Sequence, residues 1–499
     1  MKKFTSALLI LIILSLTGCA NVSYHDTSSE EESLDINQQL ESQLPDIEFE
    51  EERDFIIFTD SPTTFLQDET SPEAINTAIA ERNSFLETKY GATVVVQEKD
   101  VKALTDELDA AQKAGNHICD MISVSAKDSV KLYTLGLLGD MNLLPDFNLE
   151  NGFFDKNLTM PLATNNSLYL LADPCTLVYD STNVIYFNRN IVKAPETEDE
   201  SGQAGTESEE SDETAEPEKL ATDVELLAMQ GKWTWDKFNE YARASAPNSF
   251  SSAGSNMNTD NFGFGAEKTS TEFPAAMWVS CGKPMVPNTY KTPLEITLGI
   301  EETKEIAQYF RKLYTARGRF PLGDNSAKKA FEEGRIAFYC NDLGYLYTLR
   351  DGSNKGEEYG ILPMPKYSEE QENYCSLINT DAHVISVPKT LETADEDKKT
   401  FVSAVISATC VSGGETAKAA YLNTMLGMYL NNNAEVVLTK TIVDSATFDF
   451  TVTYGEEIYD IARGTINAVT NHITEGVYMD NYLNSANKYF KEYCDTNFQ

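Results

Sequence analysis

The sequence is poor in basic residues: 39 Lys and Arg stand against 79 Asp and Glu, which gives a formal net charge of −40. A surface of this sign repels the phosphates of nucleic acids and the headgroups of anionic lipids. The imbalance therefore argues against a nucleic-acid-binding protein and against electrostatic attachment to a membrane. A solvated acidic surface that keeps the protein soluble is the simpler interpretation.

Histidine is also scarce, with four residues at His25, His117, His383 and His472. They lie so far apart in the sequence that we expect no histidine-based metal site. The sequence contains no HExxH, GxSxG, Walker or dinucleotide-binding motif, so we expect no cofactor either. Glycoside hydrolysis needs only a close pair of carboxyl groups, and no pair stands out among the many acids. We therefore expect a protein that is not an enzyme, with a secreted glycoside or peptide hydrolase as the alternative.

Cysteine pairs at metal-ligand or redox spacing are absent: none of the eight cysteines forms a CxxC motif. If Cys19 carries a lipid, as argued next, an odd number remains, which does not predict a disulfide framework. Several of them lie in apolar runs, where cysteine behaves as a small buried hydrophobic residue. One or two disulfides stay possible, without an assignment.

Apolar runs long enough to cross a membrane are lacking as well. Ala7–Leu16 follows the positive pair Lys2-Lys3, is too short to span a bilayer and is typical of a signal peptide. It ends in Leu16-Thr17-Gly18-Cys19, which resembles the lipobox of bacterial lipoproteins, whose cysteine is acylated and becomes the mature N-terminus. This resemblance implies a signal peptide over 1–19, palmitate on Cys19 and a place on the outer face of the cell membrane of a Gram-positive bacterium. An ordinary signal peptide with a chance cysteine is the alternative.

Length sets the domain organisation. A chain of 499 residues exceeds the size at which a single core usually divides, so two lobes are expected. Residues 20–52 are polar, acidic and rich in serine without a sustained period, which predicts a disordered tether. From 195 to 219 the chain is again acidic, with no Lys or Arg between Lys193 and Lys219, which predicts a disordered insertion rather than a calcium site of fixed ligand spacing.

From Arg53 onward, strand and helix signals alternate. Short apolar runs rich in strand formers are separated by helical patterns that end at glycines. In order, the signals are strand 54–58, helix 72–91, strand 93–96, helix 101–115 and strand 119–124. This alternation predicts a parallel, doubly wound α/β sheet.

The stretch Phe331–Tyr367 has the strongest features of a binding site. Gly334 ends a helix, and Ile336–Tyr339 is a strand-like run followed by the polar turn Asn341–Tyr345. A second strand-like run, Tyr359–Leu362, leads into Pro363-Met364-Pro365, which cannot continue a central strand. Because ligands of open α/β sheets lie beyond the carboxyl ends of strands, we expect polar groups and an aromatic ring at such a site here.

Several motifs together resemble a known family. After the lipobox come Tyr-Phe-Asn-Arg at 186–189, Trp-Thr-Trp-Asp-Lys-Phe at 233–238, Phe-Glu-Glu-Gly-Arg-Ile-Ala-Phe at 331–338 and Tyr-Gly-Ile-Leu-Pro-Met-Pro-Lys at 359–366. In this order they are similar to the family 1 extracellular solute-binding proteins of ABC importers, the group that contains the maltose-binding proteins. The acidic insertion departs from the family pattern but lies outside these motifs.

The resemblance implies a two-lobed, periplasmic-binding-protein-like α/β fold, with two doubly wound sheets joined by a hinge. The chain is then expected to cross between the lobes near 172–174, 362–365 and 412–414. These crossings give lobe 1 as 53–172 with 363–412, and lobe 2 as 173–362 with 413–499. The implied partners are a small solute, ABC permease subunits and the membrane reached by the lipid anchor, with the protein itself a monomer.

A sugar ligand would need aromatic rings for its apolar faces and carboxylates, amides or hydroxyls for its rim. The resemblance contributes Trp278, in a region similar to the pocket-lining helix of the family, and Tyr345, near a usual stacking position. Each candidate could equally be a core or turn residue. The full set of candidate ligand-binding residues is Asp60, Ser61, Ser123, Ser125, Trp278, Asn341, Asp342 and Tyr345.

The sequence thus predicts a lipid-anchored importer subunit that captures a small solute, with a carbohydrate as the expected class. A ligand-sensing surface lipoprotein without a permease is a further alternative. The identity of the solute does not follow from the sequence, because specificity depends on the geometry of a few side chains.

Overall fold

The computed structural model describes residues 44–164, 166–195, 221–246, 260–266, 272–284, 326–350, 358–430 and 432–454, with the single residues 42, 305, 306, 488 and 492. The chain divides into two compact units, Met1–Pro45 and Asp46–Gln499, and the named strands and helices lie in the second. Cys19, most of the predicted tether, the acidic insertion apart from its first residue, and a closing helix expected over 476–493 lie outside the described residues.

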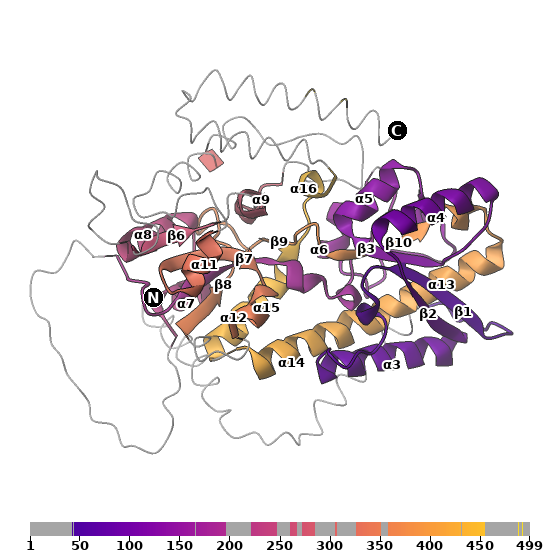
Figure 1. Ribbon diagram of the computed structural model, residues 1–499, viewed down its shortest axis with the longest axis horizontal. Helices are drawn as coiled ribbons and strands as arrows, with labels where there is room; N and C mark the ends of the chain where they lie inside the picture. Colours follow the sequence, from indigo (N-terminus) through magenta and orange to yellow (C-terminus); the bar gives the residue numbers. More distant parts are fainter. Residues whose placement is uncertain are drawn as a thin grey trace, which may run out of the picture. The chain divides into compact units, whose positions relative to one another are not determined.

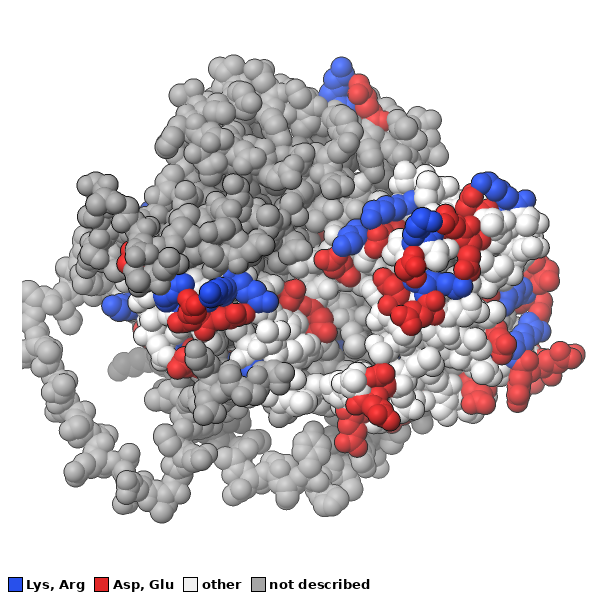
Figure 2. All heavy atoms as spheres, in the orientation of Figure 1, with Lys and Arg blue, Asp and Glu red and all other residues white. Residues whose placement is uncertain are grey.

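Lobe 1 is built on a five-stranded sheet. On the face of this lobe seen in Figure 2, acidic and basic side chains are interspersed. β1 pairs in parallel with both β2 and β3, so the predicted parallel sheet is confirmed, whereas β10 pairs antiparallel with β3 and β4. The strands lie in the order β2 (Ala92–Glu98), β1 (Arg53–Thr59), β3 (Met121–Ser125), β10 (His383–Pro388) and β4 (Leu138–Gly139).

The two helices predicted at 72–91 and 101–115 begin and end close to those bounds, as α3 and α4. Gly91 and Gly115 cap α3 and α4 in the left-handed conformation, with φ of 62° and 68°. In Figure 1, α3 and α13 lie side by side on one side of the strands, and α4 and α5 lie on the other. The bounds are α3 (Glu73–Tyr90), α4 (Val101–Ala114), α5 (Ala126–Thr134) and α13 (Glu396–Ser412).

Lobe 2 carries a four-stranded mixed sheet. β5 runs antiparallel to both of its neighbours, β7 and β8, while β6 is parallel to β7. The order is β6 (Phe262–Gly265), β7 (Ile336–Asp342), β5 (Asn183–Asn188) and β8 (Tyr359–Leu362). The amino end of β5 therefore lies at the same edge as the carboxyl end of β7, and Asn183 is paired with Asp342.

The polar turn expected over 341–345 is shorter in the structure. The ladder to β5 extends β7 through Asn341 and Asp342, and Tyr345 begins the short helix α12 (Tyr345–Arg350). Only Leu343 and Gly344 form the turn between them.

Further helices cover the sheet of lobe 2, and Thr234 caps one of them by accepting a hydrogen bond from the Lys237 amide. Trp233 and Trp235 are fully buried and pack edge-on against Phe238. The bounds are α7 (Asp223–Met229), α8 (Trp235–Ser245), α9 (Glu272–Ser280), α11 (Ser326–Glu332) and α15 (Asn433–Asp444).

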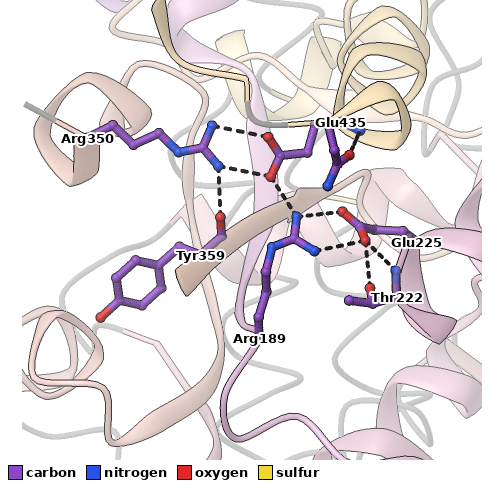
Figure 3. Close-up of polar contacts among 7 residues, drawn as sticks. Arg189, Thr222, Glu225, Arg350, Tyr359 and Glu435 are labelled. Carbon is purple, nitrogen blue, oxygen red and sulfur yellow. Dashed lines mark hydrogen bonds and ion pairs between the residues drawn. The ribbon is translucent and has the colours of Figure 1, made fainter. Parts of the chain in front are cut away.

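A buried network of charges holds the helices of lobe 2 on the sheet (Figure 3). Arg189, at the end of β5, donates to Glu225 of α7 at 2.7 and 2.9 Å and to Glu435 of α15 at 2.7 Å. Arg350 of α12 donates to the same oxygen of Glu435 at 2.9 Å and to the Tyr359 carbonyl at 2.8 Å. Both glutamate side chains are fully buried, so each depends on the arginines for its charge partner.

The connection between the lobes is a narrow set of extended segments. β9 (Ser376–Leu377) pairs with β11 (Ala446–Thr447), and isolated bridges join Thr182 to Ile378 and Leu171 to Ile385. Lys366 and Tyr374 still contact lobe 2, through Trp233 and the Ala228 carbonyl. The lobe boundaries stay predictions, and these contacts favour a second crossing at 376–382 rather than 362–365.

The C-terminal part of the described chain touches both lobes. α14 (Lys418–Met428) packs on α3 of lobe 1 and on α15 of lobe 2. α16 (Phe450–Tyr454) packs on α5, and the Tyr454 hydroxyl donates to the Leu162 carbonyl at 2.7 Å. The segment after 412 is therefore not confined to lobe 2.

Candidate functional site

The strand ends of lobe 1 form a polar edge. β1 and β3 are parallel, so Asp60 and Ser125 lie at the same edge of the sheet, and His383 begins β10 opposite Ser125. His383 Nε2 lies 3.3 Å from Asp60 Oδ1, with the two side chains 19% and 34% exposed. Burial lowers the pKa of His383 despite the nearby carboxylates, so at neutral pH it is an uncharged donor or acceptor. Because both side chains are partly exposed, the Asp60 carboxyl group and the His383 ring are accessible to a solute.

Two of the three serines of this edge already make hydrogen bonds within the protein. Ser125 Oγ donates to Asp128 Oδ2 at 2.6 Å and caps α5 by accepting from the Asp128 amide. Ser61 Oγ lies 3.2 Å from the Thr64 hydroxyl in the turn after β1. Ser123 is fully buried within β3, and its hydroxyl has no partner among the described residues. Ligand contact by these three serines stays a prediction.

The strand ends of lobe 2 form a second polar edge. Asn341 and Asp342 end β7, and both are partly exposed. Asp342 Oδ1 accepts from the Tyr345 amide at 2.9 Å, which fixes one oxygen of the carboxyl group and leaves the other for a ligand. Burial raises the pKa of Asp342, and the charge of Asp381 raises it further.

The segment between β9 and β10 joins the two edges. The Asn379 amide donates to the Ser181 carbonyl of lobe 2 at 2.9 Å, and the Lys127 amide of lobe 1 donates to the Thr380 carbonyl at 3.0 Å. Asp381 is exposed on this segment and pairs with Lys127. Its negative charge contributes an upward shift to the pKa of Asp342 and to that of His383. The segment 379–383 therefore contacts the neighbourhood of both edges, at Lys127 in lobe 1 and at Ser181 in lobe 2.

The two aromatic candidates are buried. Tyr345 is 5% exposed, packs edge-on against Tyr186 at 5.4 Å and donates its hydroxyl to Glu332 Oε1 at 2.9 Å. Trp278 of α9 is 3% exposed and belongs to the hydrophobic core. In this conformation neither ring is presented for stacking, and a stacking role for either one stays a prediction.

Asp180 is a site residue that sequence reasoning missed. Its Oδ1 accepts from the Tyr347 hydroxyl of α12 at 2.8 Å and from the Tyr421 hydroxyl of α14 at 2.9 Å. Burial raises the pKa of Asp180 to about 6, and the charge of Asp342 contributes to the rise. A Cβ on Gly344 would lie 3.3 Å from the Asp180 carbonyl oxygen, so glycine leaves room for the acid.

The reason Asp180 was missed is the direction of β5. A search for polar residues after strands looks at carboxyl ends, whereas Asp180 stands before the amino end of β5. Because β5 is antiparallel to β7, that end lies beside Asp342.

Among the described residues no group of three or more acids, histidines and cysteines is placed to hold a metal ion. No helix within the described ranges is long and apolar enough to span a bilayer.

Comparisons with known proteins place the chain in a family. The model of the bacterial extracellular solute-binding proteins matches residues 82–448. A comparison of the sequence with curated proteins gave no match.

Solved structures share the fold at low identity. The maltose-binding periplasmic protein MalE of Listeria monocytogenes, in complex with maltose, is 15% identical with a TM-score of 0.53, covering 88% of this chain and 98% of its own. A family 1 extracellular solute-binding protein of Bifidobacterium longum subsp. infantis is 12% identical with a TM-score of 0.50, covering 88% and 99%.

A third structure, UgpB of Mycobacterium tuberculosis in complex with glycerophosphocholine, is 12% identical with a TM-score of 0.51, covering 90% and 100%. At these identities the likeness establishes the two-lobed α/β fold and no ligand. The fold and the family match agree with the resemblance seen in the sequence motifs. The chain belongs to the bacterial extracellular solute-binding proteins.

Proposed function

We propose that this protein captures a small solute between the two polar edges and delivers it to the permease of an ABC importer. The observation that supports the proposal is that the segment 379–383 contacts both edges: His383 lies 3.3 Å from Asp60 of lobe 1, and the Asn379 amide donates to the carbonyl of Ser181, next to Asp180 of lobe 2. Carboxylates from both lobes at one place can bind two sides of the same molecule.

A carbohydrate is the solute class that this chemistry supports best. Carboxylate and imidazole groups accept and donate hydrogen bonds to hydroxyls without requiring a charge on the ligand. The acids of the two edges outnumber the bases, which disfavours anionic solutes. The structure of the Listeria relative contains maltose, while that of UgpB contains glycerophosphocholine, so both classes belong in a screen.

Capture would proceed by hinge closure. The lobes are joined in part by extended segments, whose cross-links include the hydrogen bond from Asn183 Nδ2 to the Leu377 carbonyl at 2.9 Å, and α14 packs on helices of both lobes. Small rotations of such segments allow one lobe to approach the other. A solute favours the closed state only by the contacts that it makes there and not in the open state.

The lipid anchor and the permease complete the proposal. Acylation of Cys19 through two or more chains would hold the protein on the outer face of the cell membrane. Tethering then raises the effective concentration of the loaded protein near its membrane partner. Mass spectrometry of the mature N-terminus checks the anchor, and an unmodified N-terminus at any residue other than Cys19 contradicts it.

A thermal-shift screen of the full-length protein tests the solute. We expect a mono- or oligosaccharide to raise the melting temperature in a concentration-dependent manner, because a ligand that binds only the native state stabilises it by mass action. Asp60→Ala and Asp342→Ala should each weaken the shift, while Asp109→Ala, an exposed acid on α4, should leave it unchanged. If peptides or glycerophosphocholine give shifts and no sugar does, the carbohydrate assignment is wrong.

A further inference from the structure

Two buried cysteines from distant parts of the chain lie at the base of the hinge. Cys175 belongs to the short helix η4 (Pro174–Thr176) at the first crossing, and Cys410 lies near the end of α13. They are 3% and 0% exposed, and both thiols are free in the structure. Helices η4 and α13 pack on each other, so the two cysteines come from neighbouring elements.

Gly413 shows how close the two cysteines are. It keeps helical backbone at the end of α13, and its amide donates to the Cys410 carbonyl. Residues three apart on a helix share a face and have Cβ atoms about 5–6 Å apart. A Cβ on Gly413 would overlap the Cβ of Cys175, so Cys175 packs against this face. The Cβ atoms of Cys175 and Cys410 are therefore about 3–8 Å apart, a range that includes the separation of about 3.5–4.5 Å in disulfides.

A single carboxyl group lies beside both thiols. Asp173 is fully buried, and its Oδ1 accepts from the Cys175 amide at 2.9 Å. Burial raises the pKa of Asp173 to about 7, and hydrogen bonding from the Cys175 amide and from the thiols of Cys175 and Cys410 opposes the rise. Both sulfur atoms thus lie next to one small group, as the two halves of a disulfide must.

The surroundings determine when such a bond can form. Burial raises the pKa of both thiols well above its usual range, so neither is a reactive thiolate in the folded protein. An oxidant must therefore act while the chain is folding, before α13 covers Cys175. The family is extracellular, and outside the cell disulfides persist once they are formed.

We propose that Cys175 and Cys410 form a disulfide when the chain folds in an oxidising environment. The two thiols together lose two protons and two electrons as the sulfur–sulfur bond forms. A small-molecule disulfide accepts both electrons, and its own bond breaks to give two thiols. The cross-link joins the first crossing to the end of α13 at the third, and it depends neither on the solute nor on the permease.

Peptide mapping tests the pairing. The full-length protein is unfolded with reductant, refolded in reduced and oxidised glutathione, then unfolded again in iodoacetamide and digested without reductant. We expect the peptide with Cys175 to be linked to the peptide with Cys410, while Cys119 and Cys340 are alkylated. Alkylation of both Cys175 and Cys410 overturns the inference, and so does linkage of either one to glutathione or to a different cysteine.

The melting temperature tests whether the cross-link fits the folded protein. A disulfide that closes a loop of more than two hundred residues restricts the unfolded chain, so the oxidised wild type should melt about 5 °C above the reduced one. Cys410→Ser should melt at the same temperature in both preparations. Cys119→Ser, at another fully buried cysteine of lobe 1, is the matched control and should keep the difference. A wild type with one melting temperature in both preparations contradicts a cross-link in the folded hinge.

Discussion

At the scale of single residues, the proposed binding region contains carboxyl groups whose pKa values are raised by burial. Asp180 and Asp342, and Asp173 elsewhere in the chain, have raised pKa values because desolvation penalises their charged forms. Asp173 reaches about 7 and Asp180 about 6. Acids of this kind hold protons at mildly acidic pH that an exposed acid would have lost.

The raised pKa of Asp180 predicts a pH-dependent stability. The folded state binds the proton more tightly than the unfolded state, whose Asp has a pKa of 3.8, so the free energy of unfolding falls as pH rises from about 4 to about 6. Asp180→Asn removes this titration while keeping an oxygen that accepts from Tyr347 and Tyr421. The difference between wild type and variant, from urea unfolding at several pH values, should change by about 1–3 kcal/mol across that window and be constant above pH 7.

The matched control for this experiment is Asp106→Asn, because Asp106 pairs with Lys102 on the exposed face of α4. Its difference curve, measured over the same range from pH 4 to pH 7, should stay nearly flat because the pair is exposed. A flat curve for Asp180→Asn as well would show that the carboxyl group of Asp180 titrates normally in the folded protein.

At the scale of elements, buried ion pairs and helix caps stabilise the packing of the helices on the sheet of lobe 2. The network of Arg189, Glu225, Arg350 and Glu435 joins three helices to two strands (Figure 3). Burial raises the pKa of Glu225, but hydrogen bonds and charge from Arg189 outweigh it and hold the pKa below its ordinary value. The pair Arg189 and Glu225 also stands on either side of the acidic stretch 195–219, so it joins the chain before the insertion to the chain after it.

Removal of one member of the network should be costly. Glu435→Gln takes the charge from between Arg189 and Arg350 and leaves two buried cations with one carboxylate, so we expect a loss of about 3–5 kcal/mol in the free energy of unfolding. Glu240→Gln, which breaks the exposed pair with Lys237, should cost less than about 1 kcal/mol. If chemical denaturation showed equal losses in the free energy of unfolding for both variants, burial would not determine how much each ion pair stabilises the protein.

The cap of α8 gives a smaller, separate effect. Thr234→Ala removes the acceptor for the Lys237 amide and should destabilise the protein by about 1 kcal/mol, while Thr234→Ser should restore most of the loss. Thermal unfolding of the three proteins checks this. A serine variant as unstable as the alanine variant would show that the buried methyl group of Thr234, and not its hydroxyl, is what matters.

At the scale of the whole molecule, two sheets in one chain are linked by segments that leave and re-enter each lobe. The first crossing follows the bridge between Leu171 and Ile385, and the second ends where β10 enters the sheet of lobe 1. Helix α14 adds contacts to both lobes. Such a connection permits rotation without separating the lobes.

Closure predicts a change of size on binding. The solute found in the thermal screen should reduce the radius of gyration measured by small-angle X-ray scattering, and it should leave the Asp60→Ala/Asp342→Ala variant unchanged. The Asp109→Ala variant is the control that should still contract. A wild-type protein that binds solute with no change in radius would contradict capture by hinge closure.

The sequence alone determined the local structure. Alternating apolar runs and glycine stops located β1, α3, β2, α4 and β3, because strand and helix signals depend on neighbours within a turn or two of the chain. The ordered motifs from 186 to 366 indicated the family and, through it, the two-lobed fold.

The tertiary structure decided which polar residues meet. The direction of β5 placed Asp180 beside Asp342, and the ladder to β5 drew Asn341 and Asp342 into a strand where a turn was expected. Packing folded Tyr345 back onto Tyr186, although its position after a strand suggested an exposed ring. These outcomes depend on strand order and on contacts between residues more than a hundred positions apart, which no local pattern encodes.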